Sequence, residues 1–371
     1  MVLDLQANEL MSVWFKDRFL FPVIAILLGC GMALLLLEIV LRVASLAPPR
    51  GLHSVNESNY KAIPGIWNPG QDFIWKELPP LPYHVSINAL GYRGTELQRD
   101  KKADELRVFV VGDSYTFGSF VDNEETLPAQ LESRLADKCT AKDVSVINSG
   151  VPGSTIRTQV NMIERGLVLK PDLVALVFHD NDIENLADPL WDRIVVNRAS
   201  KSKFPVSVIW PLIRNTATWN FYLRIREIVR SKDILALNVD SKNRQLNEDE
   251  SKIDPAMTKK LKALYMKDLY DLADRLSEQN LEFVFVVYPG HHYVRGELFD
   301  DLPDWAEKTG VAGNIPTLNL GNALRQGLGD DVDAGFSLPY DGHPSKLGYQ
   351  LAGEAMADYL LQQTGIKAFC S

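Results

Sequence analysis

An uninterrupted apolar segment near the N-terminus constrains this chain more than any other feature. Residues 20–37 contain no charged side chain. A helix rises about 1.5 Å per residue, so about 20 apolar residues are needed to cross the hydrocarbon core of a bilayer. Glu38 interrupts the run, but three apolar residues follow it before Arg42. We therefore predict a membrane-spanning helix over residues 19–43, after a short N-terminal tail over residues 1–18.

Two other interpretations of this segment stay open at the level of sequence. One is a buried core helix, although an all-round apolar stretch of this length exceeds a usual core helix. The other is a cleaved signal peptide, because Ser45-Leu46-Ala47 resembles a cleavage site. The apolar run is longer than a typical signal core, however, and Glu38 and Arg42 lie between it and that site.

The composition of the chain is that of an ordinary globular protein, with 46% hydrophobic and 23% charged residues. The net charge of −9 argues against a nucleic-acid partner, because neutralising phosphates requires a basic face. Three cysteines exclude a disulfide framework and a four-cysteine zinc site. Cys139 and Cys370 could pair in an oxidising compartment and would stay free in a reducing one, while Cys30 falls inside the apolar segment.

Short apolar runs alternate with helical patterns in the second half of the chain. We predict buried strands at residues 107–111, 144–147, 173–178 and 281–288, and a short fifth strand at 317–320. Amphipathic spacing predicts helices at residues 124–136, 256–279 and 346–362. This alternation is typical of an α/β fold in which helices cover both faces of a mainly parallel sheet.

Two regions depart from this rhythm. Residues 44–82 are rich in proline, glycine and aromatic residues, so we expect an irregular stalk or arm. Residues 185–255 mix aromatic residues with charge runs, and we interpret them as a largely helical insertion beside the sheet. The folded domain is therefore expected to comprise residues 83–371 and to contain this insertion.

Reactive side chains follow the predicted strands at the points where the strands end. The relevant segments are Gly112-Asp113-Ser114-Tyr115, Asn148-Ser149-Gly150-Val151-Pro152-Gly153, His179-Asp180-Asn181-Asp182 and, before the last helix, Asp341-Gly342-His343-Pro344. Ligands gather at the carboxyl ends of parallel strands, so we expect these segments to form one site. A serine becomes a good nucleophile when a histidine removes its proton and a carboxylate orients that histidine.

These four segments resemble the sequence blocks of the SGNH/GDSL hydrolase family, over about residues 85–361 apart from the insertion. The resemblance implies a three-layer α/β/α flavodoxin-like fold and a Ser-His-Asp site without a cofactor or metal. Ser114 would be the nucleophile, His343 the general base and then acid, and Asp341 the residue that orients His343. The backbone N–H groups of Ser114 and Gly153 and the amide of Asn181 would form the oxyanion hole.

The chain departs from the family pattern at two of these blocks. His179 stands where the family usually has glycine, and one residue rather than two separates Asp341 from His343. A nearby acidic residue could replace Asp341, or the site could be a Ser–His dyad. The acidic candidates are Asp330, Asp331 and Asp333. The upstream segment Asn88-x-x-Gly91-Tyr92-Arg93-Gly94 also resembles a stretch found in membrane-anchored bacterial members.

Simpler interpretations exist for several of these residues. Each could have a purely structural role: Ser114 as a helix cap, Asn181 as part of a turn, and His343 as a residue at the start of the last helix. The run from His179 to Glu184 invites a metal site, but no distant second set of ligands accompanies it. His291 and His292 follow the fourth predicted strand, where they would be surface residues or substrate contacts.

The resemblance implies a membrane-anchored esterase or deacylase acting on acyl esters, with acetyl esters of cell-envelope carbohydrate as the expected substrate. One alternative is an O-acyltransferase acting on an exopolysaccharide or envelope glycan. Others are a non-catalytic carbohydrate-binding or assembly protein, and a lipid-acting esterase in which the aromatic-rich insertion forms a lid. No nucleic-acid partner is expected, and the sequence identifies no protein partner.

The orientation of the chain in the membrane does not follow from charge alone. Lys16 and Arg18 precede the apolar segment, and Arg42 and Arg50 follow it, so the positive charges are balanced. Guided by the family resemblance, we expect the N-terminus inside and the large domain on the extracytoplasmic side of a bacterial inner membrane.

Overall fold

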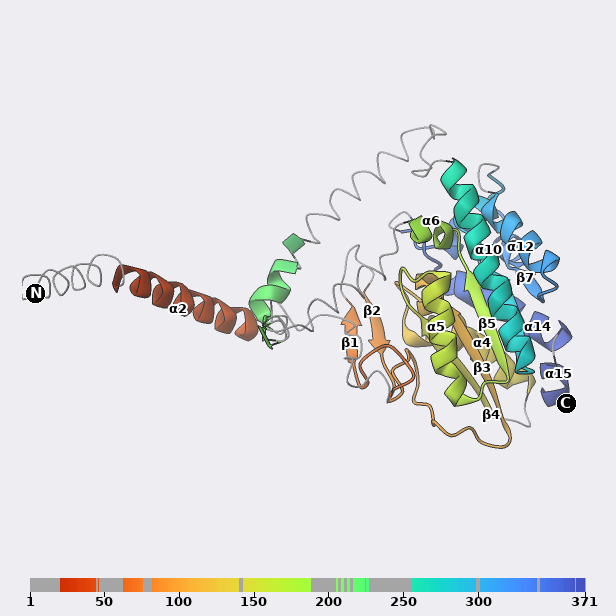
Figure 1. Cartoon of the computed structure of the whole chain (residues 1–371), viewed down its shortest axis with the longest axis horizontal. Coiled ribbons are helices and arrows are strands. Elements are labelled where there is room, and N and C mark those ends of the chain that lie inside the picture. The colour runs from red at the N-terminus through yellow and green to blue at the C-terminus, as the bar shows by residue number, and fades with distance from the viewer. Residues whose placement is uncertain are drawn as a thin grey trace, which may run out of the picture. The chain divides into compact units, whose positions relative to one another are not determined.

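The computed structural model of the chain divides into two compact units, one of residues 1–50 and 199–230 and one of residues 51–198 and 231–371. Each unit is described by itself (Figure 1). The structure describes residues 21–44, 46, 63–75, 82–139, 143–187, 205, 208–209, 212–213, 216–223, 225–226, 255–297, 301–338, 341–363 and 365–370. The remainder of the predicted insertion and the tail over residues 1–18 lie outside the described residues.

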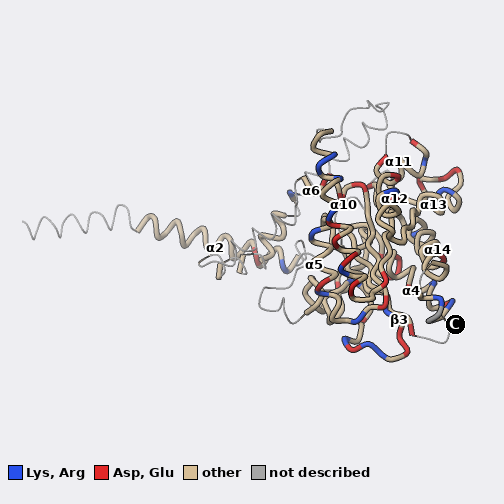
Figure 2. The backbone as a smooth tube through the Cα atoms, turned by 45° about the vertical axis from the view of Figure 1, so that its right-hand side comes forward, with Lys and Arg blue, Asp and Glu red and all other residues tan. Residues whose placement is uncertain are grey.

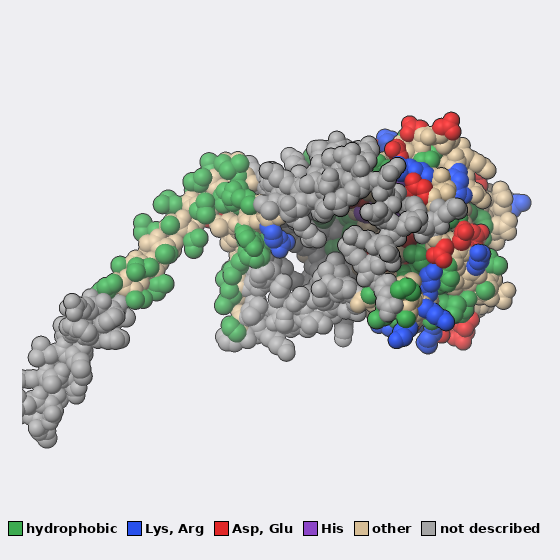
Figure 3. Space-filling view, turned by 90° about the horizontal axis from the view of Figure 1, so that it is seen from above, with side chains coloured by type: hydrophobic (Ala, Val, Ile, Leu, Met, Phe, Trp, Pro, Cys, Tyr) green, Lys and Arg blue, Asp and Glu red, His purple; other side chains and the backbone are tan. Residues whose placement is uncertain are grey.

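The first unit is dominated by helix α2 (Phe21–Val43), which is long and apolar enough to cross a membrane. Its side chains are exposed along nearly the whole helix, and hydrophobic groups cover the face of it that Figure 3 shows. The buried core helix considered above is therefore excluded. Charged residues are absent from most of its length (Figure 2). The described residues of the insertion between 205 and 226 belong to this unit.

The second unit is built on a five-stranded parallel sheet with the order β4-β3-β5-β6-β7. The strands are β3 (Glu105–Gly112), β4 (Asp143–Gly150), β5 (Leu173–Phe178), β6 (Glu282–Val287) and β7 (Thr317–Asn319). In the register, Val110 lies opposite Asn148 of β4 and Ala175 of β5. All five predicted strands are confirmed. Strands β3, β5 and β6 are largely apolar and almost fully buried, as strands covered on both faces are, whereas the three-residue β7 is only half-buried.

Helices cover both faces of this sheet and confirm the three-layer architecture. Alternate residues of β3 face opposite sides, so that Phe109 and Val111 join one core cluster while Val108 and Val110 join the other. The first cluster is covered by α5 (Ile156–Gly166), α10 (Pro255–Glu278) and α12 (Leu302–Ala312). The second cluster is covered by α4 (Leu127–Lys138), α13 (Gly321–Leu328) and α14 (Lys346–Gln363).

The segment expected to be wholly irregular contains a strand. Strand β1 (Asp72–Trp75) pairs antiparallel with β2 (Tyr83–Ser86), and the rings of Trp75 and Tyr83 stack with centroids 5.8 Å apart. Trp67 is also buried, in the same core cluster as α5 and α10. The expectation is wrong here because a four-residue strand between prolines gives too short a pattern to stand out from an irregular arm.

A disulfide joins Cys139, which caps α4, to Cys370 at the end of α15 (Ile366–Cys370). The Cα atoms are 4.4 Å apart, and the two cysteines are 231 positions apart in sequence. The cross-link fixes the C-terminal helix α15 to the end of α4. The structure therefore contains the pairing that the sequence left open.

Replacing both cysteines, as Cys139→Ser with Cys370→Ser, is expected to lower the free energy of unfolding by about 2–4 kcal/mol, because the unfolded chain gains the entropy that the long closed loop removes. Urea unfolding of the full chain in detergent measures this change. Adding a reductant to the unmodified chain should reproduce the variant's midpoint, and an unchanged midpoint would contradict the cross-link.

Candidate active site

Ser114 occupies the first position of a short helix, α3 (Ser114–Phe117), directly after the central strand β3. The Asp113 carboxylate caps this helix by accepting the Tyr115 backbone N–H at 2.9 Å. The preceding glycine has no space for a side chain, because a Cβ on Gly112 would lie 2.9 Å from the Val177 carbonyl oxygen. Gly112 therefore avoids a clash with the neighbouring strand, Asp113 caps α3, and Ser114 is the first residue of that helix.

The structure brings His343 and Asp341 to this serine. His343 Nε2 lies 2.8 Å from Ser114 Oγ, and His343 Nδ1 bonds to Asp341 Oδ1. The same carboxylate oxygen accepts the backbone N–H of His343 at 2.9 Å. Because of this tight turn, the Asp341 carboxylate reaches the His343 ring although only one residue separates the two. Asp333, one of the alternatives, forms an ion pair with Arg295 instead.

The environment of Asp341 keeps its carboxylate ionised. Burial alone would raise the pKa of this group. Hydrogen bonds from the His343 ring and from the backbone N–H groups of His343 and Gly342, together with the charge of His343, outweigh burial and hold the pKa below its usual range. An ionised carboxylate at this position fixes the tautomer of His343 and stabilises the imidazolium.

Gly153 lies in the loop that follows β4, the strand beside β3. Its φ of +72° falls in the left-handed region that favours glycine. This loop is tied to the end of β3, because the Val151 backbone N–H and the Ser154 hydroxyl both donate to the Gly112 carbonyl, at 3.0 and 3.1 Å. The loop that contains Gly153 is therefore held at Gly112, two positions before Ser114 in the sequence.

Asn181 begins α6 (Asn181–Ala187) after β5, the other neighbour of β3. Its side-chain oxygen is buried without a hydrogen-bond partner in the part of the chain that the structure describes. The next residue, Asp182, is fully buried and accepts the His179 backbone N–H and the Gln159 amide, both at 3.3 Å. Burial raises the pKa of Asp182, which serves to hold the turn between β5 and α6.

The histidine at the usual glycine position is supported by an aromatic ring. His179 stacks on Tyr115 with ring centroids 3.6 Å apart, and its Nδ1 atom lies 3.0 Å from the Tyr288 carbonyl oxygen. The Tyr115 hydroxyl donates to the Gly342 carbonyl at 2.8 Å, between the two catalytic candidates of the last loop. Among the described residues, no three His, Cys, Asp or Glu side chains are grouped as metal ligands would be.

Phe120 was not identified from the sequence, although it borders the site. Its ring lies 5.4 Å from the His343 ring, edge to face. Its φ of +70° is a strained value for a bulky residue, and such strain persists where the surroundings enforce it. The residue is thus held against the imidazole by the fold of its loop.

Arg93 enforces the shape of the segment after the nucleophile. Its buried guanidinium donates to the backbone carbonyls of Phe117, Gly118, Val121 and His84 at 2.6–2.9 Å, and Nε donates to Asn123 at 2.8 Å. Burial lowers the pKa of Arg93 to about 10, so the group is still charged at neutral pH. The upstream Asn-x-x-Gly-Tyr-Arg-Gly segment therefore supports the site.

His291 begins α11 (His291–Val294) and lies against the last loop of the site, where a Cβ on Gly342 would be 3.5 Å from its Nδ1 atom. Burial, followed by the charges of His292 and Arg295, lowers the pKa of His291 to about 4. The ring is therefore neutral at neutral pH. His292, by contrast, pairs with Glu297.

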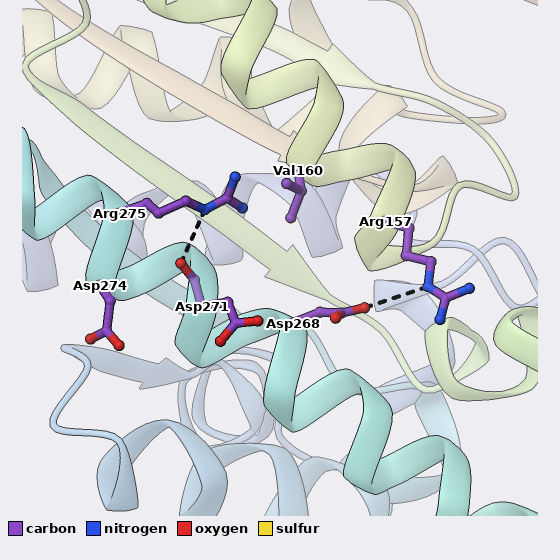
Figure 4. A pocket seen from close by; sticks show the side chains of 6 residues that line it. All are labelled: Arg157, Val160, Asp268, Asp271, Asp274 and Arg275. Carbon is purple, nitrogen blue, oxygen red and sulfur yellow. Dashed lines mark hydrogen bonds and ion pairs between the residues drawn. The ribbon is translucent and has the colours of Figure 1, made fainter.

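A separate groove lies between α5 and α10, lined by two arginines, three aspartates and a valine (Figure 4). Its charges compensate one another: Arg157 pairs with Asp268 at 3.5 Å, and Arg275 pairs with Glu164. The lining contains no histidine or nucleophile, so we assign no chemistry to it.

The chain is similar to several known proteins. The sequence profile of the GDSL-like lipase/acylhydrolase family matches residues 110–351. No curated protein sequence matches the chain. Similar solved structures include a G-D-S-L family lipolytic protein from Desulfitobacterium hafniense (15% identity, 68% of this chain and 99% of that chain covered, TM-score 0.39). Another is a lipase/acylhydrolase from Enterococcus faecalis (16%, 70% and 96%, TM-score 0.39), and a third is an acetylxylan esterase from Geobacillus stearothermophilus (14%, 70% and 94%, TM-score 0.39).

The variant Asp341→Asn is expected to lower kcat for ester hydrolysis by about 10²–10⁴-fold, because the wrong tautomer of His343 then faces Ser114. Steady-state kinetics on p-nitrophenyl acetate measures this loss. Asp333→Asn is the matched control, since this carboxylate pairs with Arg295, and it should retain kcat. Equal losses in both variants would contradict the assignment of Asp341.

The lowered pKa of His291 predicts a pH-dependent stability. Between its ordinary pKa of 6.5 and about 4, the unfolded chain binds a proton at this residue and the folded chain does not, so stability falls as the pH falls through this window. Between pH 7 and pH 4.5, the urea midpoint of His291→Gln should therefore fall less than the midpoint of the unmodified chain. Parallel curves for the variant and the unmodified chain would contradict this prediction.

Proposed function

This chain belongs to the GDSL-like lipase/acylhydrolase family and is a serine hydrolase acting on ester bonds, and we propose that it is a membrane-anchored deacylase that removes short acyl groups by Ser-His-Asp catalysis. One observation carries the proposal: Ser114 Oγ lies 2.8 Å from His343 Nε2, whose other ring nitrogen bonds to Asp341. This is the geometry that activates a serine hydroxyl.

The proposed reaction has two steps. His343 takes the proton of Ser114 as Oγ attacks the ester carbonyl, and it then gives that proton to the departing alcohol. Water attacks the resulting acyl-serine with His343 again as the base. His343 then returns the proton to Ser114 Oγ as the bond to the acyl group breaks, and the carboxylic acid leaves. Donors from Ser114, Gly153 and Asn181 would stabilise the negative oxygen of each tetrahedral intermediate, with about 3 kcal/mol per donor.

Crowding around the nucleophile favours a small acyl group. Ser114 is only 7% exposed, and the rings of Tyr115 and Phe120 lie 5.1 and 5.4 Å from the His343 ring. These rings and the stacked His179 limit the volume next to the serine. An acetyl group suits such a site better than a long acyl chain does.

Two features support an anchored enzyme on the extracytoplasmic side. Near its C-terminal end, α2 bonds through Glu38 to Ala217 and Thr218, and these contacts with other parts of its unit support an anchor that stays with the chain. The disulfide between Cys139 and Cys370 is of a kind that persists in oxidising compartments. A tethered enzyme is suited to a bulky substrate that does not diffuse, such as an acetylated envelope carbohydrate.

The assembled triad supports catalysis over the non-catalytic alternative. Hydrolysis and transfer to a sugar hydroxyl share the acyl-serine intermediate, so they differ only in the acceptor. Acetylated polysaccharide incubated with the full chain distinguishes them: free acetate indicates hydrolysis, and acetylated acceptor oligosaccharide indicates transfer.

The full chain in detergent is expected to hydrolyse p-nitrophenyl acetate with a kcat/KM at least about tenfold higher than that for p-nitrophenyl decanoate, because the crowded site excludes the longer chain. Ser114→Ala is the control and should abolish both activities. A preference for the decanoate would contradict the short-acyl proposal and favour a lipid-acting esterase.

A further inference from the structure

We propose that the described residues of the insertion between 205 and 226 lie in the surface layer of the same bilayer that α2 crosses, as a second membrane contact of the chain. The proposal depends on the part of the proposed function that treats α2 as a membrane-spanning helix. It concerns only the unit that contains both segments, so it does not depend on the catalytic site.

A cluster of hydrogen bonds fixes the insertion to α2. The Glu38 carboxylate accepts the backbone N–H groups of Ala217 and Thr218 at 2.8 and 2.9 Å, and the Thr218 hydroxyl at 2.9 Å. Arg42, one turn further along α2, donates to the same carboxylate at 2.7 Å. Residues 217–223 are helical, so Glu38 satisfies N–H groups that the first turn of this helix leaves free.

Apolar contacts reinforce this junction. Leu41 and Ala217 are both buried against each other, with Phe221 packed at their side. Leu41 is the only buried side chain of α2, whose other apolar residues face outward. The start of the 217–223 helix is therefore held against α2 at Glu38 and Leu41.

The position of Glu38 along α2 sets the depth of this level. The uncharged residues 20–37 cover about 27 Å at 1.5 Å per residue, close to the hydrocarbon thickness of about 30 Å. Glu38 then lies at the edge of the hydrocarbon, where a carboxylate requires hydrogen-bond partners. The helix that supplies them must lie at the same level, in the headgroup layer.

The residues of the insertion around this junction suit that layer. Their exposed apolar side chains are Val208, Ile209, Leu212, Ile213, Tyr222 and Ile225. Within residues 199–226 the sequence carries five basic residues and no acidic one. Aromatic and aliphatic groups combined with positive charge are typical of segments that bind the surface of anionic membranes.

This charge pattern favours lipid over a second copy of the chain as the occupant. In a symmetric contact between copies, the same basic segment would face itself, and like charges would repel. In a membrane, the basic side chains instead meet lipid phosphates while the apolar ones enter the acyl boundary.

Spin labels on the full chain test the proposal, in vesicles of phosphatidylcholine and phosphatidylglycerol. Cys139 and Cys370 are joined, so native Cys30 in α2 is the one free thiol among the described residues. One sample carries the label on Cys30. The others carry Cys30→Ala with Leu212→Cys, with Ile225→Cys, or with Val311→Cys on exposed α12 of the second unit as the control. Collisions with oxygen and with a water-soluble nickel chelate report the depth of each label.

We expect the labels at positions 212 and 225 to lose nickel collisions relative to position 311 and to gain oxygen collisions, as labels in the membrane surface do. Equal nickel access at 212, 225 and 311, with the Cys30 label shielded, overturns the inference and leaves the anchor intact. Nickel access at Cys30 overturns the anchor itself. Spin–spin broadening at 212 without oxygen access overturns the inference in favour of a contact between copies.

Discussion

The hydrogen bond between Ser114 and His343 is the interaction on which the proposed function of this chain depends. It joins residues 229 positions apart, so it forms only if the whole second unit is folded. Strand β4, the next strand in the chain, lies on one side of β3, and the following strand β5 lies on its other side. The loops diverge at this point of the sheet edge, which leaves room for a ligand, and Ser114 lies there at the start of α3, directly after the buried strand β3.

A second set of contacts fixes the positions of Ser114 and His343. Arg93 binds four backbone carbonyls around the nucleophile segment, and a buried guanidinium with this many partners permits little movement. Tyr115 bonds to the carbonyl of Gly342 and stacks on His179, so it links the nucleophile helix to the last loop. These contacts come from parts of the chain distant in sequence, which ties the geometry of the site to overall stability.

The sequence predicted the five strands and the helices α4, α10 and α14, because buried parallel strands are largely apolar runs and long helices repeat every 3.6 residues. It did not predict α5, α12 and α13, which also cover the sheet. It also predicted Ser114, His343 and Asp341, although the short Asp-x-His spacing left Asp341 open until the turn geometry was visible. Phe120 was missed because its contact with His343 depends on an unusual backbone angle. The partner of Glu38 was missed because nothing local indicates that a distant insertion would satisfy it.

The proposed function requires that His343 activates Ser114. Labelling of the full chain with a serine-reactive fluorophosphonate, followed by mass spectrometry of the modified peptide, tests it most directly. We expect an adduct on Ser114 that disappears in His343→Ala. No adduct in a folded chain whose Cys139–Cys370 disulfide is intact, or an adduct on a different serine, would contradict the claim.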